Sequence, residues 1–245
     1  FNEIKLDRNP LISLRKWLVH EQIAARTYAT VNCAFCVGQW ARQSALNHGF
    51  APDQAKVVPQ PFDPAPFSNA LDQKEKEKLK KELELDPTRQ TVLYVGSLNW
   101  EKGSDRLLKT IQIVSKQTDK VQFCIVGDGS YSSELARNAN KCTMLTGPVP
   151  RRKMPAYYHA ADLLIHPTRR DGLPNVILEA IAARVPVVAS PIGEIPHYIT
   201  HTCSAPEDFA EYILSESWNC EPYPSWFDTQ VQRQTYLSNF YELLP

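Results

Sequence analysis

Two carboxylates separated by seven residues are the feature of this sequence best suited to binding a ligand. Asp171 and Glu179 lie in the stretch Asp162–Glu179, DLLIHPTRRDGLPNVILE, where a short apolar run leads into a polar loop. A helix is expected to open at Pro174, because proline suits the first helical position. Helix N-termini attract phosphate through free N–H groups and the helix dipole. The spacing therefore suits a nucleotide-sugar, with the sugar at one carboxylate, the ribose at the other and the diphosphate between them.

Apolar segments alternate with amphipathic ones after residue 72, and this alternation would position the two carboxylates. Strands are expected at 91–95, 121–126, 143–145, 163–165 and 186–189, and helices at 104–114, 132–138, 154–160 and 175–183. Such an alternation forms a parallel, doubly wound sheet, in which ligands bind beyond the carboxyl ends of the strands. The predicted fold class is α/β, a doubly wound parallel sheet of Rossmann-like type, with a partial second α/β domain.

A proline-rich stretch divides the chain. Pro59–Pro66 has four prolines in eight residues and is expected to be an interdomain linker. The charged helix expected at 73–84 is interpreted as a solvated face. Before the linker, the pattern predicts a strand at 28–36, a helix at 39–48 and a strand at 56–58. The predicted domains are 1–58, a linker at 59–72, an α/β domain at 73–224 and a C-terminal segment at 225–245 with a helix over 225–244.

At these residues the chain resembles the donor-binding half of the retaining GT-B glycosyltransferases of family four. That family carries P-S-x-x-E-G-x-x-x-V-x-x-E-A, and Pro167–Ala180 has this pattern with Asp171 in place of the first Glu, an arm shorter by one methylene. The resemblance extends over roughly residues 20–244. It implies a donor-binding domain at 73–224, the end of an acceptor-binding domain at 1–58, and a final helix that packs back on the N-terminal part.

The turn Gly96–Gly103 follows an expected strand and precedes an expected helix. It is similar to the family's G-R-L-x-x-x-K-G, whose Arg and Lys clamp the leaving diphosphate; Lys102 matches, and Ser97 stands in the Arg position. A serine donates one hydrogen bond and carries no charge, unlike the arginine fork. Arg151, Arg169 and Arg170 are the candidates to replace it. Without the resemblance, Lys102 would be interpreted as a surface lysine of an ordinary turn.

Three further turns have counterparts in the family. Gly127 lies in a turn after a strand, where glycines mostly serve the turn itself. Val149 and Arg151 lie where relatives border the nucleotide base, and Gly193 begins a turn similar to G-G-x-P-E. The resemblance implies catalytic roles for Lys102, Asp171 and Glu179. The implied donor-binding residues are Gly96, Ser97, Gly127, Val149, Arg151, Thr168, Gly172, Leu173, Pro174 and Asn175.

The acidic residues have simpler interpretations as well. Glu179 lies in a nearly apolar segment, so its carboxylate must reach solvent, a donor or a ligand, and the simplest case is the wet face of the helix. Asp171 before a glycine and a helix could be an ordinary capping turn. His166, directly after a strand, is either a ligand contact or a structural histidine.

Composition excludes some partners. The net charge is zero and the pI about 7.1, so neither nucleic acid nor an anionic membrane is favoured electrostatically. No apolar run approaches a membrane span of about 18 residues; peripheral membrane association of the full-length protein stays open. The six cysteines are expected to be reduced thiols of a cytoplasmic protein, with Cys33 and Cys36 as core thiols rather than metal ligands. No metal or cofactor is expected.

The expected function is retaining transfer of a hexosyl group from a nucleoside-diphosphate sugar to an acceptor hydroxyl, in glycan, glycolipid or polysaccharide synthesis. The chain begins at Phe1 without a leader, and residues 1–58 lack the Gly-rich loop of the family's acceptor domain. It is therefore expected to be a fragment that binds nucleotide but is inactive alone. The alternatives are a GT-B epimerase or phosphorylase, a nucleotide-binding module, and a structural partner whose pocket has decayed.

Overall fold

The computed structural model describes residues 30–69, 71–138 and 141–241. By its internal contacts the chain forms two compact units. The smaller comprises residues 1–60 and 234–245, and the larger comprises residues 61–233. The larger unit contains every residue for which a binding or catalytic role was predicted.

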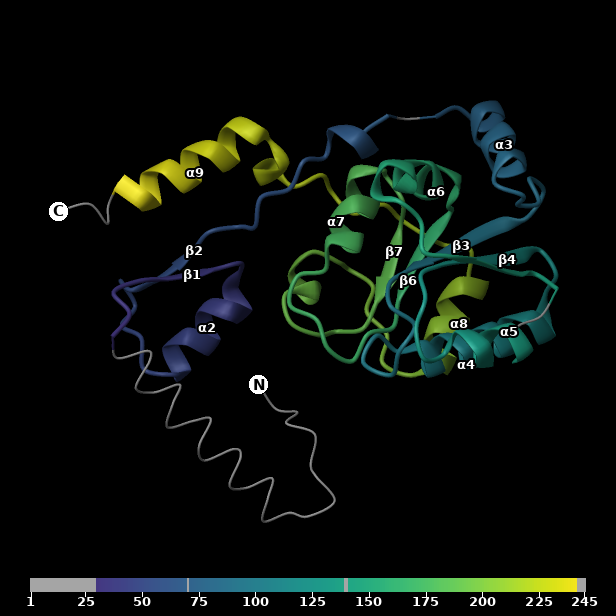
Figure 1. The fold of residues 1–245 in the computed structure, drawn as a ribbon, viewed down its shortest axis with the longest axis horizontal. Helices are drawn as coiled ribbons and strands as arrows, with labels where there is room; N and C mark the ends of the chain where they lie inside the picture. Colours follow the sequence, from purple (N-terminus) through teal and green to yellow (C-terminus); the bar gives the residue numbers. More distant parts are fainter. Residues whose placement is uncertain (1–29, 70, 139–140, 242–245) are drawn as a thin grey trace, which may run out of the picture. The chain divides into compact units, whose positions relative to one another are not determined.

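A five-stranded parallel sheet forms the centre of the larger unit (Figure 1). Its strands are β3 (Gln90–Val95), β4 (Val121–Val126), β5 (Thr143–Gly147), β6 (Leu163–His166) and β7 (Val187–Ala189). They lie in the order β5-β4-β3-β6-β7. The chain thus builds outward from β3 to β5 and then crosses back to place β6 on the other side of β3. The predicted fold class, α/β with a doubly wound parallel sheet, is confirmed.

Helices cover both faces of this sheet (Figure 1). One face carries α3 (Gln73–Glu82), α6 (Met154–Ala160) and α7 (Asn175–Ala182), and the other carries α4 (Ser104–Gln117), α5 (Ser132–Asn138) and α8 (Pro206–Leu214). Each face has its own buried cluster, because successive strand residues point to opposite sides. Leu93 therefore joins the cluster with α6 and α7, and Tyr94 joins the cluster with α4 and α8.

The described part of the larger unit also contains four short 3-10 helices, at Ala65–Phe67, Arg151–Lys153, Ile195–His197 and Ser225–Phe227. The segment that leads into the first of these 3-10 helices contacts residues near the C-terminal end of the larger unit. Phe62 N donates to Gln232 Oε1 at 3.0 Å, and Gln232 Nε2 donates back to Phe62 O at 2.8 Å. The ring of Phe62 also lies 4.9 Å from that of Phe227.

The smaller unit contains a parallel pair of strands, β1 (Ala34–Cys36) and β2 (Ala55–Val57), joined by α2 (Gln39–Asn47). The strand expected at 28–36 is shorter in the structure. Residues 30–33 do not belong to a strand, and residues 28–29 lie outside the described residues. The helix expected over 225–244 begins later, as α9 (Thr229–Tyr241), and residues 242–244 lie outside the described residues. Within the smaller unit, Tyr236 Oη donates to Pro59 O at 2.7 Å. All six cysteines are free thiols.

No helix within the described ranges is long and apolar enough to cross a membrane.

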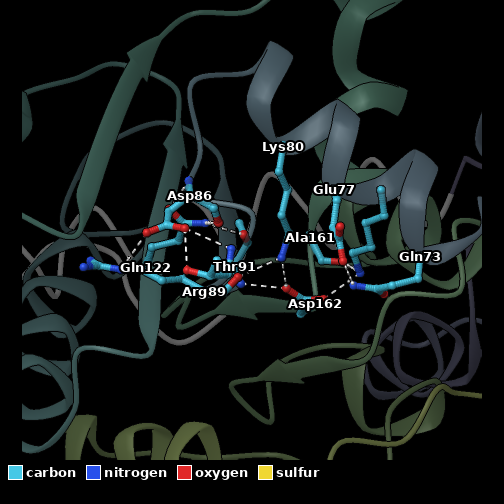
Figure 2. Close-up of polar contacts among 11 residues, drawn as sticks. Gln73, Glu77, Lys80, Asp86, Arg89, Thr91, Gln122, Ala161 and Asp162 are labelled. Carbon is cyan, nitrogen blue, oxygen red and sulfur yellow. Dashed lines mark hydrogen bonds and ion pairs between the residues drawn. The ribbon is translucent and has the colours of Figure 1, made fainter.

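The interpretation of α3 as a solvated charged face is wrong for Lys76 and Lys80. Figure 2 shows Lys80 extending from α3 toward Asp162. Lys80 is only 4% exposed, and its Nζ lies 2.7 Å from Asp162 Oδ2 and 2.8 Å from Arg89 O. Lys76 Nζ lies 2.6 Å from Asp162 Oδ1. The same aspartate accepts a hydrogen bond of 2.7 Å from Thr91 N. The two lysines therefore fasten α3 to the sheet, while other charged residues of the helix face water.

Candidate functional site

Two loops meet at the carboxyl edge of the sheet where the strand order reverses. The loop 96–103 follows β3, and the loop 167–174 follows β6, its neighbour in the sheet. Ligands of open parallel sheets bind outside the carboxyl ends of the strands, at the point where the strand order reverses. Lys102 and Asp171 lie on these two loops, so the topology brings together residues that are 69 positions apart in the chain.

Lys102 and Asp171 form an ion pair. Lys102 Nζ lies 2.5 Å from Asp171 Oδ2, and His166 Nε2 lies 3.2 Å from the same oxygen. His166 is the last residue of β6 and is buried, so its ring is fixed beneath the carboxylate. Asp171 is not the N-cap of α7, because that position is Pro174. The interpretation of Asp171 as a capping residue is therefore wrong.

The environment of Asp171 keeps its carboxyl ionised. Burial raises the pKa of this carboxyl, but the hydrogen bonds from His166 and Lys102 and the positive charge of Lys102 oppose burial. The net result is a pKa below the ordinary value for aspartate. Asp171 is thus a charged hydrogen-bond acceptor at neutral pH. Its charge also compensates that of Lys102 when no anion is bound.

The two loops are fastened to each other by backbone contacts. Gly103 has φ +74°, and a Cβ built on it would lie 1.9 Å from Pro167 O, so only glycine fits there. Arg169 N donates to Glu101 O at 2.8 Å, and Thr168 Oγ1 donates to the same carbonyl at 3.2 Å. Thr168, expected to contact the donor, is fully buried, and its hydroxyl is used inside these loops. The loops therefore hold Lys102 and Asp171 at a fixed separation.

Glu179 occupies a buried position on α7. It is only 8% exposed, so its interpretation as a residue on the wet face of the helix is wrong. Tyr158 Oη, from α6, donates to Glu179 Oε2 at 2.6 Å. Burial raises the pKa of the Glu179 carboxyl; the Tyr158 hydrogen bond and the charge of Arg151 act in the opposite direction without cancelling the rise. Arg151, expected near the base, is thus the charged group that acts on Glu179.

Of the three arginines considered as replacements for the missing clamp, Arg169 is already engaged. Its guanidinium nitrogens lie 2.6 and 2.7 Å from the two carboxylate oxygens of Asp105, and its Cζ lies 4.4 Å from the ring centre of Trp100. Arg151 and Arg170 are exposed, and neither forms an ion pair within the part of the chain that the structure describes. Ser97 is exposed as well.

The other expected donor-binding residues surround this edge in different ways. Gly127 allows close contact between two turns, because a Cβ there would lie 1.9 Å from Gly96 O. Leu173 and Val149 pack against the core beside α7. At the start of α7, Gly172 and Asn175 are exposed and Pro174 is buried. Gly96, directly after β3, is partly buried.

Tyr158 and Asp105 are the residues of this region that the sequence did not identify. A glutamate in an apolar segment requires a donor, but that requirement does not say which residue supplies it. Asp105 stands in the first turn of α4, where acidic residues are common for reasons of helix stability alone. Within the described residues, no group of three His, Cys, Asp or Glu side chains is arranged as metal ligands would be.

Known proteins share both the sequence and the fold of this region. The family model of the group 1 glycosyl transferases matches residues 89–215, more than half of the 245 residues. A protein of Bacillus subtilis named as the teichuronic acid biosynthesis glycosyltransferase TuaC is 35% identical over 120 residues, which cover 49% of this chain and 29% of that protein. A Mycobacterium tuberculosis protein named GDP-mannose-dependent alpha-(1-6)-phosphatidylinositol monomannoside mannosyltransferase is 33% identical over 125 residues, 46% of this chain and 32% of that protein. The chain thus spans about a third of the length of these relatives.

Solved structures agree with the fold. Anabaena HepE in complex with UDP and glucose superposes with a TM-score of 0.78 at 18% identity, covering 92% of this chain and 67% of that one. The C-terminal domain of a group 1 glycosyl transferase from Francisella tularensis, LpcC, superposes with a TM-score of 0.56 at 16% identity, covering 75% of this chain and all of that domain. Such low identities establish the shared fold alone, and it is the sequence match over residues 89–215 that places this chain in the group 1 glycosyltransferase family.

Proposed function

We propose that the protein takes part in retaining transfer of a hexosyl group from a nucleoside-diphosphate sugar to an acceptor hydroxyl, in glycan, glycolipid or polysaccharide synthesis. The observation that carries the proposal is the meeting of Lys102 and Asp171 across the switch point of the sheet, with Glu179 on the helix that follows. The names of the relatives and the ligands of the structural neighbours point to the same donor class. The nucleotide base is left open, because a GDP-dependent relative and a UDP-bound neighbour both match.

In this proposal the diphosphate lies between Lys102 and the first turn of α7. Negative charge grows on the leaving diphosphate as the glycosidic bond breaks, so an ammonium and a helix N-terminus at this position would stabilise the transition state. Lys102 would exchange Asp171 for the diphosphate when the donor binds. Asp171 would then remain with His166 and accept hydrogen bonds from the sugar, beside Leu173. No metal is needed for this charge stabilisation.

Glu179 would accept hydrogen bonds from the ribose, with Val149 and Arg151 beside the base. The sequence offers no protein nucleophile, so we propose a front-face reaction in which a donor phosphate oxygen takes the proton of the acceptor hydroxyl. The chain spans about a third of its first relatives, so we propose that these 245 residues bind the donor without transferring the sugar. Six free thiols favour a cytoplasmic location.

Calorimetry with UDP, GDP and ADP tests the proposal. We expect saturable binding of at least one of them to the 245-residue chain. Glu179→Gln keeps the size of the side chain but removes its charge, and hydrogen bonds to a charged group are worth roughly 1.5–3 kcal/mol each. We therefore expect the dissociation constant to rise by at least about tenfold. The matched control is Glu82→Gln, whose carboxylate is exposed on α3 and outside the site.

Two outcomes would contradict the proposal. The first is the absence of binding by all three nucleotides, which would favour a structural partner with a decayed pocket. The second is equal affinity for the wild type and Glu179→Gln, which would remove Glu179 from the site. Efficient glycosyl transfer by the 245 residues alone would contradict the assignment of this chain as a donor-binding part only.

A further inference from the structure

The hydrogen bond between Tyr158 and Glu179 joins a buried hydroxyl and a buried carboxylate. Neither group forms another hydrogen bond with a side chain among the described residues. Tyr158 is fully buried on α6, and its hydroxyl lies 2.6 Å from Glu179 Oε2. A buried hydroxyl or carboxylate without a partner is costly, so each group satisfies the other. The contact therefore constrains the rotamers of both side chains.

The two oxygens of Glu179 differ in their surroundings. Oε2 receives the Tyr158 hydrogen bond, whereas Oε1 accepts none from the described residues. Among the described residues, the fully buried side-chain atoms without a hydrogen-bond partner are Gln90 Oε1, Ser104 Oγ, His166 Nδ1 and Tyr212 Oη. Glu179 Oε1 is not among them and so retains access to solvent. The carboxylate thus has one oxygen fixed inside the protein and one open oxygen with free lone pairs.

The ring of Tyr158 also contacts a second buried aromatic ring. The edge of Phe67 contacts it, with ring centroids 5.5 Å apart and an interplanar angle of 84°. Phe67 is buried at the end of the 3-10 helix Ala65–Phe67. The tyrosine therefore contacts that 3-10 helix through its ring and α7 through its hydroxyl. Contacts at both the ring and the hydroxyl suit a residue that orients another side chain.

The charges around Glu179 fix the direction of the hydrogen bond. Burial and the nearby charge of Glu179 raise the pKa of the Tyr158 hydroxyl far above its ordinary value, so it stays protonated and donates. The charged and titratable groups that act on Glu179 from the elements around it are Tyr158 on α6 and Arg151 on the 3-10 helix Arg151–Lys153. Both lower the pKa of the Glu179 carboxyl and so favour its ionised form.

We propose that Tyr158 is a positioning residue: its hydroxyl holds Oε2 of Glu179 so that Oε1 presents its lone pairs to the ribose hydroxyls of a nucleoside diphosphate. The inference rests on the proposed function, because it assumes that Glu179 binds the ribose. It adds Tyr158, a residue that contacts no ligand itself. Tyr158 orients the carboxylate of Glu179 and favours its ionised form. Tyr158 would therefore affect nucleotide affinity only through the ribose hydroxyls.

The test compares Tyr158→Phe with Tyr157→Phe. Tyr157 is the adjacent residue on α6, partly buried against the same core, and its hydroxyl makes no hydrogen bond with the described residues. Each variant is titrated by calorimetry with the nucleoside diphosphate that the wild type binds and with its 2′,3′-dideoxy analogue. For Tyr158→Phe we expect the dissociation constant of the parent nucleotide to rise about tenfold. The estimate is taken from metal sites, where removing a residue that orients a binding side chain lowers affinity by roughly 10- to 100-fold. Binding of the dideoxy analogue should stay unchanged.

The pH dependence supplies a readout that a merely structural role would not change. The ionised carboxylate is the form that accepts from the ribose, so affinity should fall as the pH drops through the pKa of Glu179. Losing the Tyr158 hydrogen bond raises that pKa further, so the acid limb of the binding profile should move to higher pH in Tyr158→Phe. In Tyr157→Phe the limb should stay where it is in the wild type.

The outcomes separate this inference from the function on which it rests. If Glu179→Gln weakens binding while Tyr158→Phe binds as the wild type does, the positioning role is refuted and the proposed function stands. If Tyr158→Phe loses affinity for the parent nucleotide and the dideoxy analogue equally, the tyrosine supports the fold of the pocket rather than the ribose contact, and the inference is wrong. If the wild type binds no nucleotide, both are overturned.

Discussion

The buried contacts of Asp162 allow a quantitative prediction about stability (Figure 2). We consider Asp162→Asn, which removes the charge but keeps the size of the side chain. Lys80 Nζ, 2.7 Å away, lies on a side chain only 6% exposed, so it would be left as an ammonium with little access to water. Lys76, with a side chain 22% exposed, can turn outward to solvent. The cost therefore comes mainly from Lys80.

Breaking a buried ion pair by removing one partner typically costs 3–5 kcal/mol. The Asp162 side chain is 24% exposed, so we take the lower end, about 3 kcal/mol in the free energy of unfolding. For a domain of this size, that corresponds to a fall of roughly 6–12 °C in Tm. Thermal unfolding followed by circular dichroism measures it. The matched control is Glu82→Gln, which removes the exposed Lys78–Glu82 pair at 3.8 Å and should change the stability by no more than about 0.5 kcal/mol.

The same contacts predict a pH dependence. Burial raises the pKa of the Asp162 carboxyl, but the charge of Lys76 and the hydrogen bonds from Lys76, Lys80 and Thr91 lower it below the ordinary 3.8. The stabilisation is therefore present above pH 3.8 and is lost as the pH falls through the folded-state pKa. Asp162→Asn should lack this acid-dependent loss. If it unfolds at the same temperature as Glu82→Gln, the ion pair is not what fastens α3.

Two further substitutions test how the loops and the ends of the larger unit are held. Gly103→Ala places a Cβ 1.9 Å from Pro167 O at φ +74° and should lower the free energy of unfolding by roughly 2–4 kcal/mol. The control is Gly147→Ala, which has a similar φ of +70° but no atom within 4 Å of the new Cβ, and it should lower that free energy by about 1 kcal/mol. Equal losses would contradict the steric argument. Gln232→Ala leaves the N–H and C=O of Phe62 without their partner and should lower the free energy of unfolding by about 2–3 kcal/mol; urea denaturation that shifts by less than 0.5 kcal/mol would show that water replaces the glutamine.

Much of the fold could be predicted because its strands and helices are marked by local patterns. The apolar run of β4 and the spacing in α5 and α6 gave the bounds that the structure has, Val121–Val126, Ser132–Asn138 and Met154–Ala160. The prediction ended α4 too early, at residue 114. Its last turn, Ser115–Gln117, is polar and so continues no apolar pattern that would have marked it as helical. Helix α8 was not predicted, although Pro206 at its first position and acidic residues in its first turn are ordinary signs of a helix start.

The partners of charged residues could not be predicted in the same way. Lys78 and Lys80 lie two positions apart in the same charged run, and only the contacts of Lys80 with Arg89 O and Asp162, which directly precede β3 and β6, distinguish it from the exposed Lys78. The sequence gives the charge pattern of a helix but not which of its turns meets a buried carboxylate. Asp162 lies 82 residues further along the chain. For Glu179 the need for a donor followed from its apolar neighbours, but the identity of Tyr158 required the placement of α6 beside α7.

The pairing of Lys102 with Asp171 depends on strand order, which local patterns do not determine. Had β6 been added beyond β5, the loops 96–103 and 167–174 would lie at distant points of the sheet edge. Because β6 instead pairs with β3, the single lysine kept from the expected clamp meets the aspartate that replaces the expected glutamate. Both departures from the family pattern, Ser97 and Asp171, therefore affect the same ion pair: one leaves Lys102 without a neighbouring arginine at position 97, and the other gives its partner a shorter arm. A diphosphate bound at this edge of the sheet would have to draw Lys102 away from Asp171. His166, which contacts the same oxygen from the end of β6, would keep that carboxylate in place.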